Sequence, residues 1–407
     1  MKKYVRYLLV LLMCGFLTEV KAQTTFQVDG INYYLDGSEA RVSDNQYYSG
    51  SKIIIPNSVL YDGKNYPVTS IADSAFYSNW SLIEVTIPNS VTTIGDYAFA
   101  SCSGLKTVTI PNAMTSIGRN AFYGCTGLTE VTIPNSVTTI GERAFYRCTG
   151  LQTVIWNARN AEYYNGLSYD SPFSNCDRLT DFVFGEEVEH IPAYLCRELT
   201  LLNTIVIPNS VTSIGTNAFS FCRGLTKVSI PNSVKTIEFR AFEGCTGLKT
   251  VTIGNSVTTI GESAFYSCTS LTEVSIPNSV TSIGSSVFED CSGLKTVTIG
   301  NSVTTIGDGT FNGCTSLKTV IWNARNVQDT FLSETWIPKP PFPDSDRLTE
   351  FVFGEEVEYI PAYLCYQLAS LKKLVIGNSV TSIGNHAFFC CSGLTEVTIP
   401  NSVTSIG

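Results

Sequence analysis

A hydrophobic pattern that restarts at Leu82, Leu105, Leu128 and Leu151 organises this chain. Its clearest copy is LTEVTIPNSVTTIGERAFYRCTG, residues 128–150. Within this copy Val131 and Ile133 alternate with Thr132, which is the period of a strand with one buried face. Pro134 follows and ends the strand, because proline cannot donate a hydrogen bond to a sheet ladder. Each copy of the pattern is therefore expected to begin with one short strand.

The second half of the copy predicts a return of the chain towards its starting edge. Ile140 belongs to an extended return segment, and Gly141 permits a sharp corner after it. Ala144, Phe145 and Cys148 then occupy positions i, i+1 and i+4, which lie on one face of a short helical turn. The copy thus predicts a coil made of a strand, an extended return and a short helical turn.

One such coil cannot fold alone, because the apolar area that so short a segment buries does not offset the conformational entropy that it loses. Stacking removes this difficulty, since neighbouring coils cover both open faces of each coil and pair their strands. The expected fold is an α/β solenoid, rich in β-structure, in which each 23-residue coil forms one rung.

Residues 1–22 have the pattern of a secretory signal peptide, with a basic start, an apolar run and a small-residue cleavage site that ends at Ala22. The apolar run is too short to span a bilayer comfortably, and no other stretch could serve as a membrane anchor. A lipoprotein signal around Cys14 is the alternative, although Met13 stands where such signals carry a small residue. The pattern predicts a secreted or cell-surface protein that does not insert into the membrane.

Two regions are expected in the exported chain. Residues 23–67 lack the repeat and are predicted to form an N-terminal cap over the apolar end of the stack. Apolar residues alternate there around Asp29 and Gly30, which is the signature of a β-hairpin. Residues 68–407 carry the repeat and are predicted to form the solenoid.

The repeat is interrupted twice, by insertions near residues 157–175 and 327–345. After each insertion comes an atypical rung, and residues 346–365 nearly copy residues 177–196, which indicates that a larger block was duplicated. The sequence stops at Gly407 in the middle of a rung. Such an end predicts either a truncated solenoid or an open edge that pairs with a partner or associates end to end with another copy.

Charge and composition exclude several classes of function. The formal net charge is −9, and removal of residues 1–22 would leave 22 basic and 34 acidic residues, a net charge of −12. This balance argues against nucleic acid and anionic membrane surfaces as partners. No set of nucleophile, base and orienting residue and no glycine-rich phosphate loop is visible, so neither an enzyme nor a cofactor is expected. A glycan-degrading enzyme would need paired carboxylates in a cleft, for which Glu186 and Glu187 are the available pair.

Cysteine and acidic residues suggest sites that have simpler explanations. Ten of the 13 cysteines outside the signal stand three residues before a rung's leucine, where each replaces an apolar core residue. Disulfides are one interpretation in an exported protein, but buried free thiols are favoured. Zinc is disfavoured, because no C-x-x-C pair occurs and His190 and His386 are far apart. The acidic triplets could bind calcium, but solvated acidic turns are favoured; the triplets are Glu186, Glu187 and Glu189, and Glu355, Glu356 and Glu358.

The candidate binding residues lie on the outer face of the predicted sheet. In regular rungs the residue between the two inward strand positions is Thr or Ser, as at Thr132. In the irregular rungs this position is apolar: Ile155, Val183 and Val206, and again Ile321, Val352 and Val375. The adjacent insertions add aromatic residues: Tyr163, Tyr164 and Tyr169, and then Phe331 and Trp336. Exposed apolar patches beside aromatic side chains are typical of protein-binding hot spots, although each insertion could instead fold over its own patch and seal it.

The unit L-x-x-V-T-I-P-N-S-V-T-x-I-G-x-x-A-F-x-x-C resembles the BspA-like leucine-rich repeats of bacterial surface proteins. The resemblance covers nearly the whole exported chain, and the string I-P-N-S-V-T-x-I-G is highly specific. It implies a leucine-rich-repeat stack and a secreted or surface-displayed adhesin or interaction protein, some relatives binding host matrix proteins or other bacteria. It carries over no catalytic residue.

The sequence therefore predicts a non-catalytic module that binds a protein or glycan ligand on host or neighbouring cells. The alternative is a structural spacer that displays a module absent from this chain.

Overall fold

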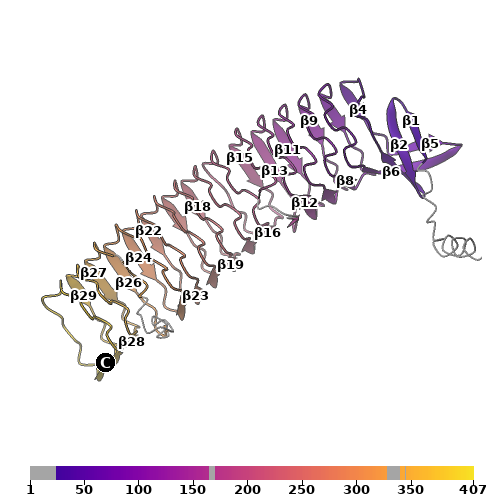
Figure 1. Cartoon of the computed structure of the whole chain (residues 1–407). Coiled ribbons are helices and arrows are strands. Elements are labelled where there is room, and N and C mark those ends of the chain that lie inside the picture. The colour runs from indigo at the N-terminus through magenta and orange to yellow at the C-terminus, as the bar shows by residue number, and fades with distance from the viewer. Residues whose placement is uncertain (1–23, 165–169, 328–339, 344) are drawn as a thin grey trace, which may run out of the picture.

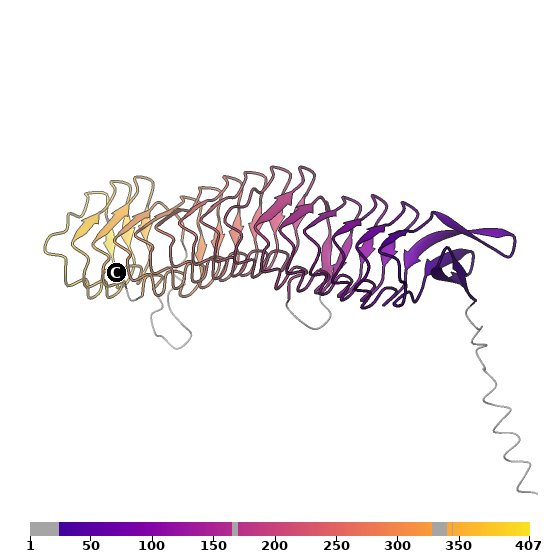
Figure 2. The same ribbon diagram turned by 90° about the horizontal axis from the view of Figure 1, so that it is seen from above.

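The stacked rungs form one elongated body in the computed structural model (Figure 1; Figure 2), which describes residues 24–164, 170–327, 340–343 and 345–407. The expected signal peptide lies outside the described residues. The solenoid itself is as the repeat predicts, with two rows of short parallel strands enclosing one continuous hydrophobic core.

The first row, called the strand row, comes from the first half of each rung. Its strands before the first insertion are β4 (Lys52–Ile54), β7 (Glu84–Thr86), β9 (Thr107–Thr109), β11 (Glu130–Ile133) and β13 (Thr153–Trp156). Those after it are β15 (Asp181–Phe184), β18 (Lys227–Ser229), β20 (Thr250–Thr252), β22 (Glu273–Ser275), β24 (Thr296–Ile299), β26 (Thr319–Trp322), β27 (Glu350–Phe353) and β29 (Lys373–Val375). They pair as three sheets, β4-β7-β9, β11-β13-β15 and β18 through β29.

The second row, called the return row, comes from the V-T-x-I segment of each rung. It begins with β8 (Thr93–Ile94), β10 (Ser116–Ile117), β12 (Thr139–Gly141), β14 (Glu162–Tyr164), β16 (His190–Ile191), β17 (Ser213–Ile214) and β19 (Thr236–Ile237). It continues with β21 (Thr259–Ile260), β23 (Ser282–Ile283), β25 (Thr305–Ile306), β28 (Tyr359–Ile360), β30 (Ser382–Ile383) and β31 (Ser405–Ile406). Among the described residues, pairing within this row does not continue from β14 to β16 or from β25 to β28, and an insertion lies between the two strands in each case.

Five strands at the N-terminal end differ from the rungs. They are β1 (Thr25–Val28), β2 (Ile31–Asp36), β3 (Glu39–Val42), β5 (Ser58–Tyr61) and β6 (Lys64–Ile71). β1 and β2 form the hairpin expected at Asp29-Gly30, and both turn residues have positive φ. β6 pairs with β3 and with β8, so it joins this unit to the return row.

The expected short helical turn is instead a run of tight turns, and no helix occurs in the part of the chain that the structure describes. In the rung at residues 128–150, Arg143 and Arg147 adopt the left-handed conformation, with φ of 56° and 58°. Two such residues recur in most rungs, which prevents a helix from continuing. Gly141 permits close approach rather than an unusual φ, because an added Cβ would lie 2.4 Å from the backbone nitrogen of Arg119 in the preceding rung.

Two ladders of side chains fill the core of the regular rungs. The phenylalanines stack face to face, as in Phe122 and Phe145, whose ring centroids are 4.9 Å apart. The ten cysteines expected in the core donate their S–H groups to the backbone carbonyl of the phenylalanine position one rung earlier, as from Cys148 to Phe122 over 3.1 Å. The thiol thus combines an apolar body with a weak donor that satisfies a buried carbonyl.

The two irregular blocks, residues 151–207 and 317–376, rearrange this core. In the first block Cys196 takes the phenylalanine position, and the lost volume is restored from the strand row by Phe182 and Phe184. Phe182 packs edge-on against Phe173 at 5.6 Å, and Phe184 packs edge-on against Phe219 at 6.3 Å. The aromatic side chains that fill the core therefore come from the strand row in this block, instead of from the turn side, and the stack of rungs continues.

Candidate functional site: the outward column of the strand row

The outward column is the row of side chains that lie between the two inward positions of each strand-row segment. Parallel pairing aligns it, so that Ile155 of β13 lies between Thr132 of β11 and Val183 of β15. In the second block Ile321 lies between Thr298 and Val352. Alternation along each strand turns these side chains away from the core.

Exposure along the column differs between its members. Val206 is 79% exposed, Val183 is 51% exposed and Val375 is 38% exposed. Ile155, Ile321 and Val352, the other apolar members in the two irregular blocks, are half-buried. Valine side chains with this exposure on neighbouring rungs form a local apolar surface beside hydroxyl-bearing residues.

The strand row is interrupted at the most exposed part of the column. Within the described residues no strand pairing joins β15 to the rung that starts at Leu202, and the strand-row pairing of that rung with the next is reduced to an isolated bridge between Thr204 and Lys227. A hollow of about 500 Å³ lies beside the interruption, and it is lined in part by Val206, Ser229 and Asn232. The first block therefore presents an apolar residue next to a concave, polar stretch of the sheet face.

The aromatic residues expected beside these patches are only partly described. Tyr163 and Tyr164 belong to β14, which pairs with β12 in the return row on the other side of the core. Their side chains, and all of Tyr169, Phe331 and Trp336, lie outside the described residues, so their contribution to a ligand site stays a prediction. The described ends of the insertions rejoin the stack at Phe173 and Phe342, which extend the phenylalanine ladder.

The cysteines of the core ladder are unsuited to nucleophilic chemistry. Burial raises the pKa of Cys102 and of Cys245 to about 12, and a thiol rather than a thiolate is a poor nucleophile. Neither lies in a cleft beside a base, since each donates to a backbone carbonyl in the core.

The acidic turns form ion pairs with arginine. Arg159 donates to Glu189 through Nε at 2.9 Å, and this hydrogen bond is the main cause that lowers the pKa of Glu189. Arg325 pairs with Glu356 in the second block. Among the described residues no group of three or more His, Cys, Asp or Glu side chains is placed to hold a metal ion.

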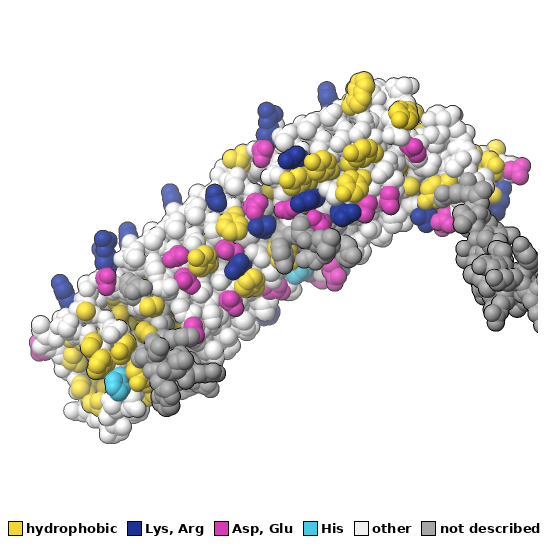
Figure 3. All heavy atoms as spheres, viewed as in Figure 1, with side chains coloured by type: hydrophobic (Ala, Val, Ile, Leu, Met, Phe, Trp, Pro, Cys, Tyr) yellow, Lys and Arg dark blue, Asp and Glu magenta, His cyan; other side chains and the backbone are white. Residues whose placement is uncertain are grey.

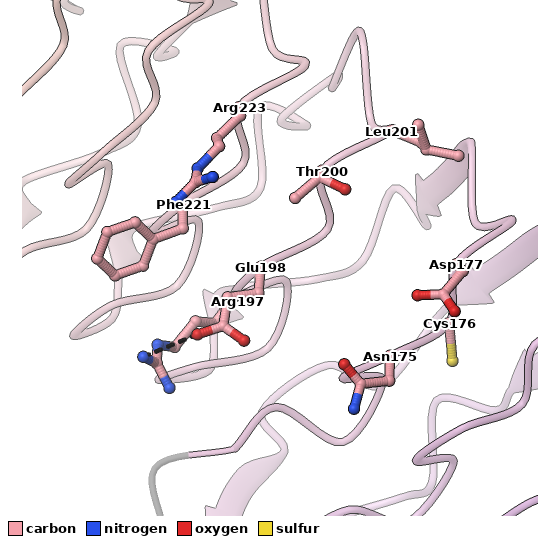
Figure 4. Close-up of a pocket in the computed structure, with 9 residues that line it drawn as sticks. All are labelled: Asn175, Cys176, Asp177, Arg197, Glu198, Thr200, Leu201, Phe221 and Arg223. Carbon is pink, nitrogen blue, oxygen red and sulfur yellow. Dashed lines mark ion pairs between the residues drawn. The ribbon is translucent and has the colours of Figure 1, made fainter.

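A second hollow lies on the turn side of the first block, with a volume of about 420 Å³ (Figure 4). Arg197 forms an ion pair with Glu198 at 2.9 Å and packs over the ring of Phe221. Leu201 at its rim is 46% exposed, and sequence reasoning missed this residue. The signal available in the sequence was that leucine replaces the Gly or Ser that most rungs carry immediately before the rung's leucine.

No helix in the described part of the chain is both long enough and apolar enough to cross a membrane.

Both the sequence and the fold of this chain are similar to those of known proteins. Residues 69–200, 189–318 and 333–407 match the BspA type leucine rich repeat region, with six copies. A leucine-rich repeat protein from Bacteroides ovatus has a similar structure, with 26% identity over 94% of this chain and 90% of that chain and a TM-score of 0.60. A leucine rich cell surface protein from Faecalibacterium prausnitzii is 28% identical over 81% of this chain and 95% of that chain, with a TM-score of 0.45. No curated protein shows significant similarity.

The matched stretches cover most of the chain, and the solenoid of stacked repeats agrees with them, so this protein belongs to the BspA type leucine-rich repeat family.

Proposed function

We propose that this protein is an exported, non-catalytic surface module that binds a protein ligand through the outward column of its first irregular block. One observation carries the proposal: Val183 and Val206 are exposed on neighbouring rungs, in a column that holds Thr or Ser in the regular rungs. Export is supported by the signal pattern of residues 1–22.

The chemistry of the column favours a protein over a glycan at this position. Aliphatic side chains bind by excluding water from apolar ligand surface, and the flanking Thr132 and Ser229 hydroxyls supply a polar rim. The ligand is expected on a host surface or a neighbouring cell, where binding makes the protein an adhesin. The aromatic residues of the insertions would add to the same contact.

The test is binding of the exported chain to a panel of host matrix proteins. The variant Val183→Thr/Val206→Thr installs the residue that regular rungs already carry, so circular dichroism should show an unchanged fold. We expect it to weaken binding about tenfold, which corresponds to about 1.4 kcal/mol.

The matched control is Thr86→Ser/Thr109→Ser, which exchanges hydroxyl residues in the same column away from the valine patch and should bind as the parent does. Equal binding by the valine variant and the parent would reject the patch. Absence of binding by every form would favour the alternative, a structural spacer that displays another module.

A further inference from the structure

A row of lysines runs along the edge of the solenoid where the strands begin. The position immediately after the rung's leucine holds Lys249, Lys295, Lys318 and Lys372, all exposed. Backbone hydrogen bonds order this row, because the Lys318 amide donates to the Lys295 carbonyl at 2.9 Å. Figure 3 shows basic side chains projecting at intervals along one edge of the body. Neighbouring rungs are about 4.8 Å apart, so Lys295 and Lys318 place like charges side by side.

These lysines have no carboxylate partners among the described residues. The lysine ion pairs in that part of the chain are those of Lys52 with Glu84 and of Lys373 with Glu350. Such a row costs stability through repulsion, and a ligand with negative charges would remove that cost.

Several acidic residues of the neighbouring rungs lie on the turn side. Glu238 accepts hydrogen bonds from Thr216, Glu289 accepts one from Asn312, and Asp290 accepts one from Tyr266. On the edge with the lysines, Glu273 is the one carboxylate within residues 248–317, all of which the structure describes, and further along Glu350 is paired with Lys373. The edge is thus basic although the protein is acidic.

A shallow groove runs beside the row on the sheet face. One part has a volume of about 440 Å³, and its polar lining comes from Thr252, Ser275, Thr296, Thr298, Asn255 and Glu273. This part shares Thr252 and Asn255 with the hollow beside Val206, so the two are continuous. Hydroxyl and amide groups that repeat with every rung can donate and accept hydrogen bonds along a ligand.

The arrangement of polar groups on this surface favours one class of polyanion as its ligand. Lysines and hydroxyls repeat by translation along the stack, which suits a linear polymer better than a folded protein. Single-stranded nucleic acid is bound by stacking its bases on aromatic side chains, and none of the groove's lining residues is aromatic. An acidic protein would be expected to use aromatic or arginine anchors, which this lining also lacks.

We infer that this edge binds a linear acidic polysaccharide. The carboxylate or sulfate groups of the polysaccharide lie along Lys249, Lys295 and Lys318. Its hydroxyl groups form hydrogen bonds with Thr252 and Ser275 of the outward column. This surface adjoins the valine patch through the shared hollow but relies on other side chains, and it does not depend on the function proposed above.

The experiment measures binding of the exported chain to polygalacturonate, to sulfated dextran and to neutral dextran over a range of salt concentrations. The variant Lys249→Gln/Lys295→Gln/Lys318→Gln removes the centre of the row. The matched control Lys52→Gln/Lys64→Gln/Lys235→Gln removes the same charge elsewhere. We expect the row variant to bind about tenfold or more weakly with a shallower salt dependence, because fewer counterions are released. The control is expected to stay within about twofold of the parent.

Binding to only one acidic polymer would identify carboxylate or sulfate as the recognised group and would support the inference. It is overturned if neither acidic polymer binds, if neutral dextran binds equally, or if both lysine variants lose the same affinity. It is also overturned if oligothymidylate or polyglutamate binds the parent as tightly as the better polysaccharide.

Discussion

The two irregular blocks have nearly the same core and different surfaces. The rings of Phe182 and Phe184 are 5.1 Å apart in the first block, and those of Phe351 and Phe353 are 4.9 Å apart in the second. Cys365 takes the phenylalanine position in the second block, as Cys196 does in the first. Duplicated sequence thus preserved the exchange of volume across the core.

The surfaces diverge where the atypical rung meets the next one. In the second block β27 pairs with β29, and Lys373 lies opposite Glu350 and forms an ion pair with it. The corresponding residues of the first block are Thr204 and Asp181, and no strand pairing is formed there within the described residues. Val206 is 79% exposed where its counterpart Val375 is 38% exposed. Accessibility of the outward column therefore varies with cross-rung pairing, while the core is unchanged.

The largest effect should come from the shared core. Phe182→Ala and Phe351→Ala should each lower the free energy of unfolding by about 3–5 kcal/mol, because each removes a buried ring from a packed cluster. Urea denaturation followed by circular dichroism measures the loss. Phe239→Ala, which removes a partly exposed ring, is the control. Losses that differ strongly between the two blocks would show that their cores are not equivalent.

Restoring the regular residue should be harmful in both blocks. Cys196→Phe and Cys365→Phe are each expected to destabilise the protein by about 1–3 kcal/mol, since Phe184 and Phe353 already supply the volume. Combining Cys196→Phe with Phe184→Ile should recover most of the loss in the same denaturation assay. If Cys196→Phe instead stabilised the protein, Phe184 would not fill the volume that is lost at position 196.

Acid should weaken the first block more than the second. Burial lowers the pKa of His190, against the opposing charges of Glu238 and Glu162, and its Nδ1 lies 2.6 Å from the Ser213 hydroxyl. The unfolded chain therefore takes up this proton first, so stability is lost as the pH falls below about 6.5 and until the folded residue protonates. The second block has Tyr359 at this position. His190→Tyr should flatten the change in urea midpoint between pH 7.5 and 5.5, and an identical change in both proteins would exclude His190 as its source.

The smallest effect should come from making the two surfaces alike. Asp181→Glu/Thr204→Lys copies the ion pair of the second block and should stabilise the first by about 0.2–1 kcal/mol, less at high salt. It should also slow hydrogen exchange of the backbone amides around Val206. The reciprocal variant Glu350→Asp/Lys373→Thr should have the opposite effect, and unchanged exchange in both would show that the pair does not control strand pairing.

The repeated part of the fold could be predicted because each 23-residue repeat contains the residues that determine where its strand lies and where it ends. Alternation at Val131 and Ile133, the stop at Pro134 and the constant spacing of the copies define the strand row and its parallel register. Alternation also predicted that Val183 and Val206 face away from the core. The left-handed turns could not be read from positions such as Arg143, because neighbouring rungs hold this conformation against the residue's own preference.

The rest of the candidate site depends on contacts between rungs. Whether β15 pairs with the next rung depends on residues that approach only after stacking, such as Asp181 and Thr204, and the sequence pattern contains no signal for it. The exchange of Cys196 against Phe184 was hidden for the same reason, because the two residues lie on opposite sides of the rung and meet only through the core.

The cysteine ladder has a consequence for how this protein is made. From Cys102 to Cys365 the folded rungs enclose their thiols, and burial raises the pKa of Cys314 to about 12, so these thiols resist oxidants; in the last described rung Cys391 is half-buried and Cys390 is exposed. An unfolded chain has no such protection, since its thiols have ordinary pKa values and can form disulfides that no rung could accommodate. In an oxidising compartment the rungs must therefore stack before the thiols are oxidised. The yield of native protein then depends on the rate of stacking relative to the rate of thiol oxidation.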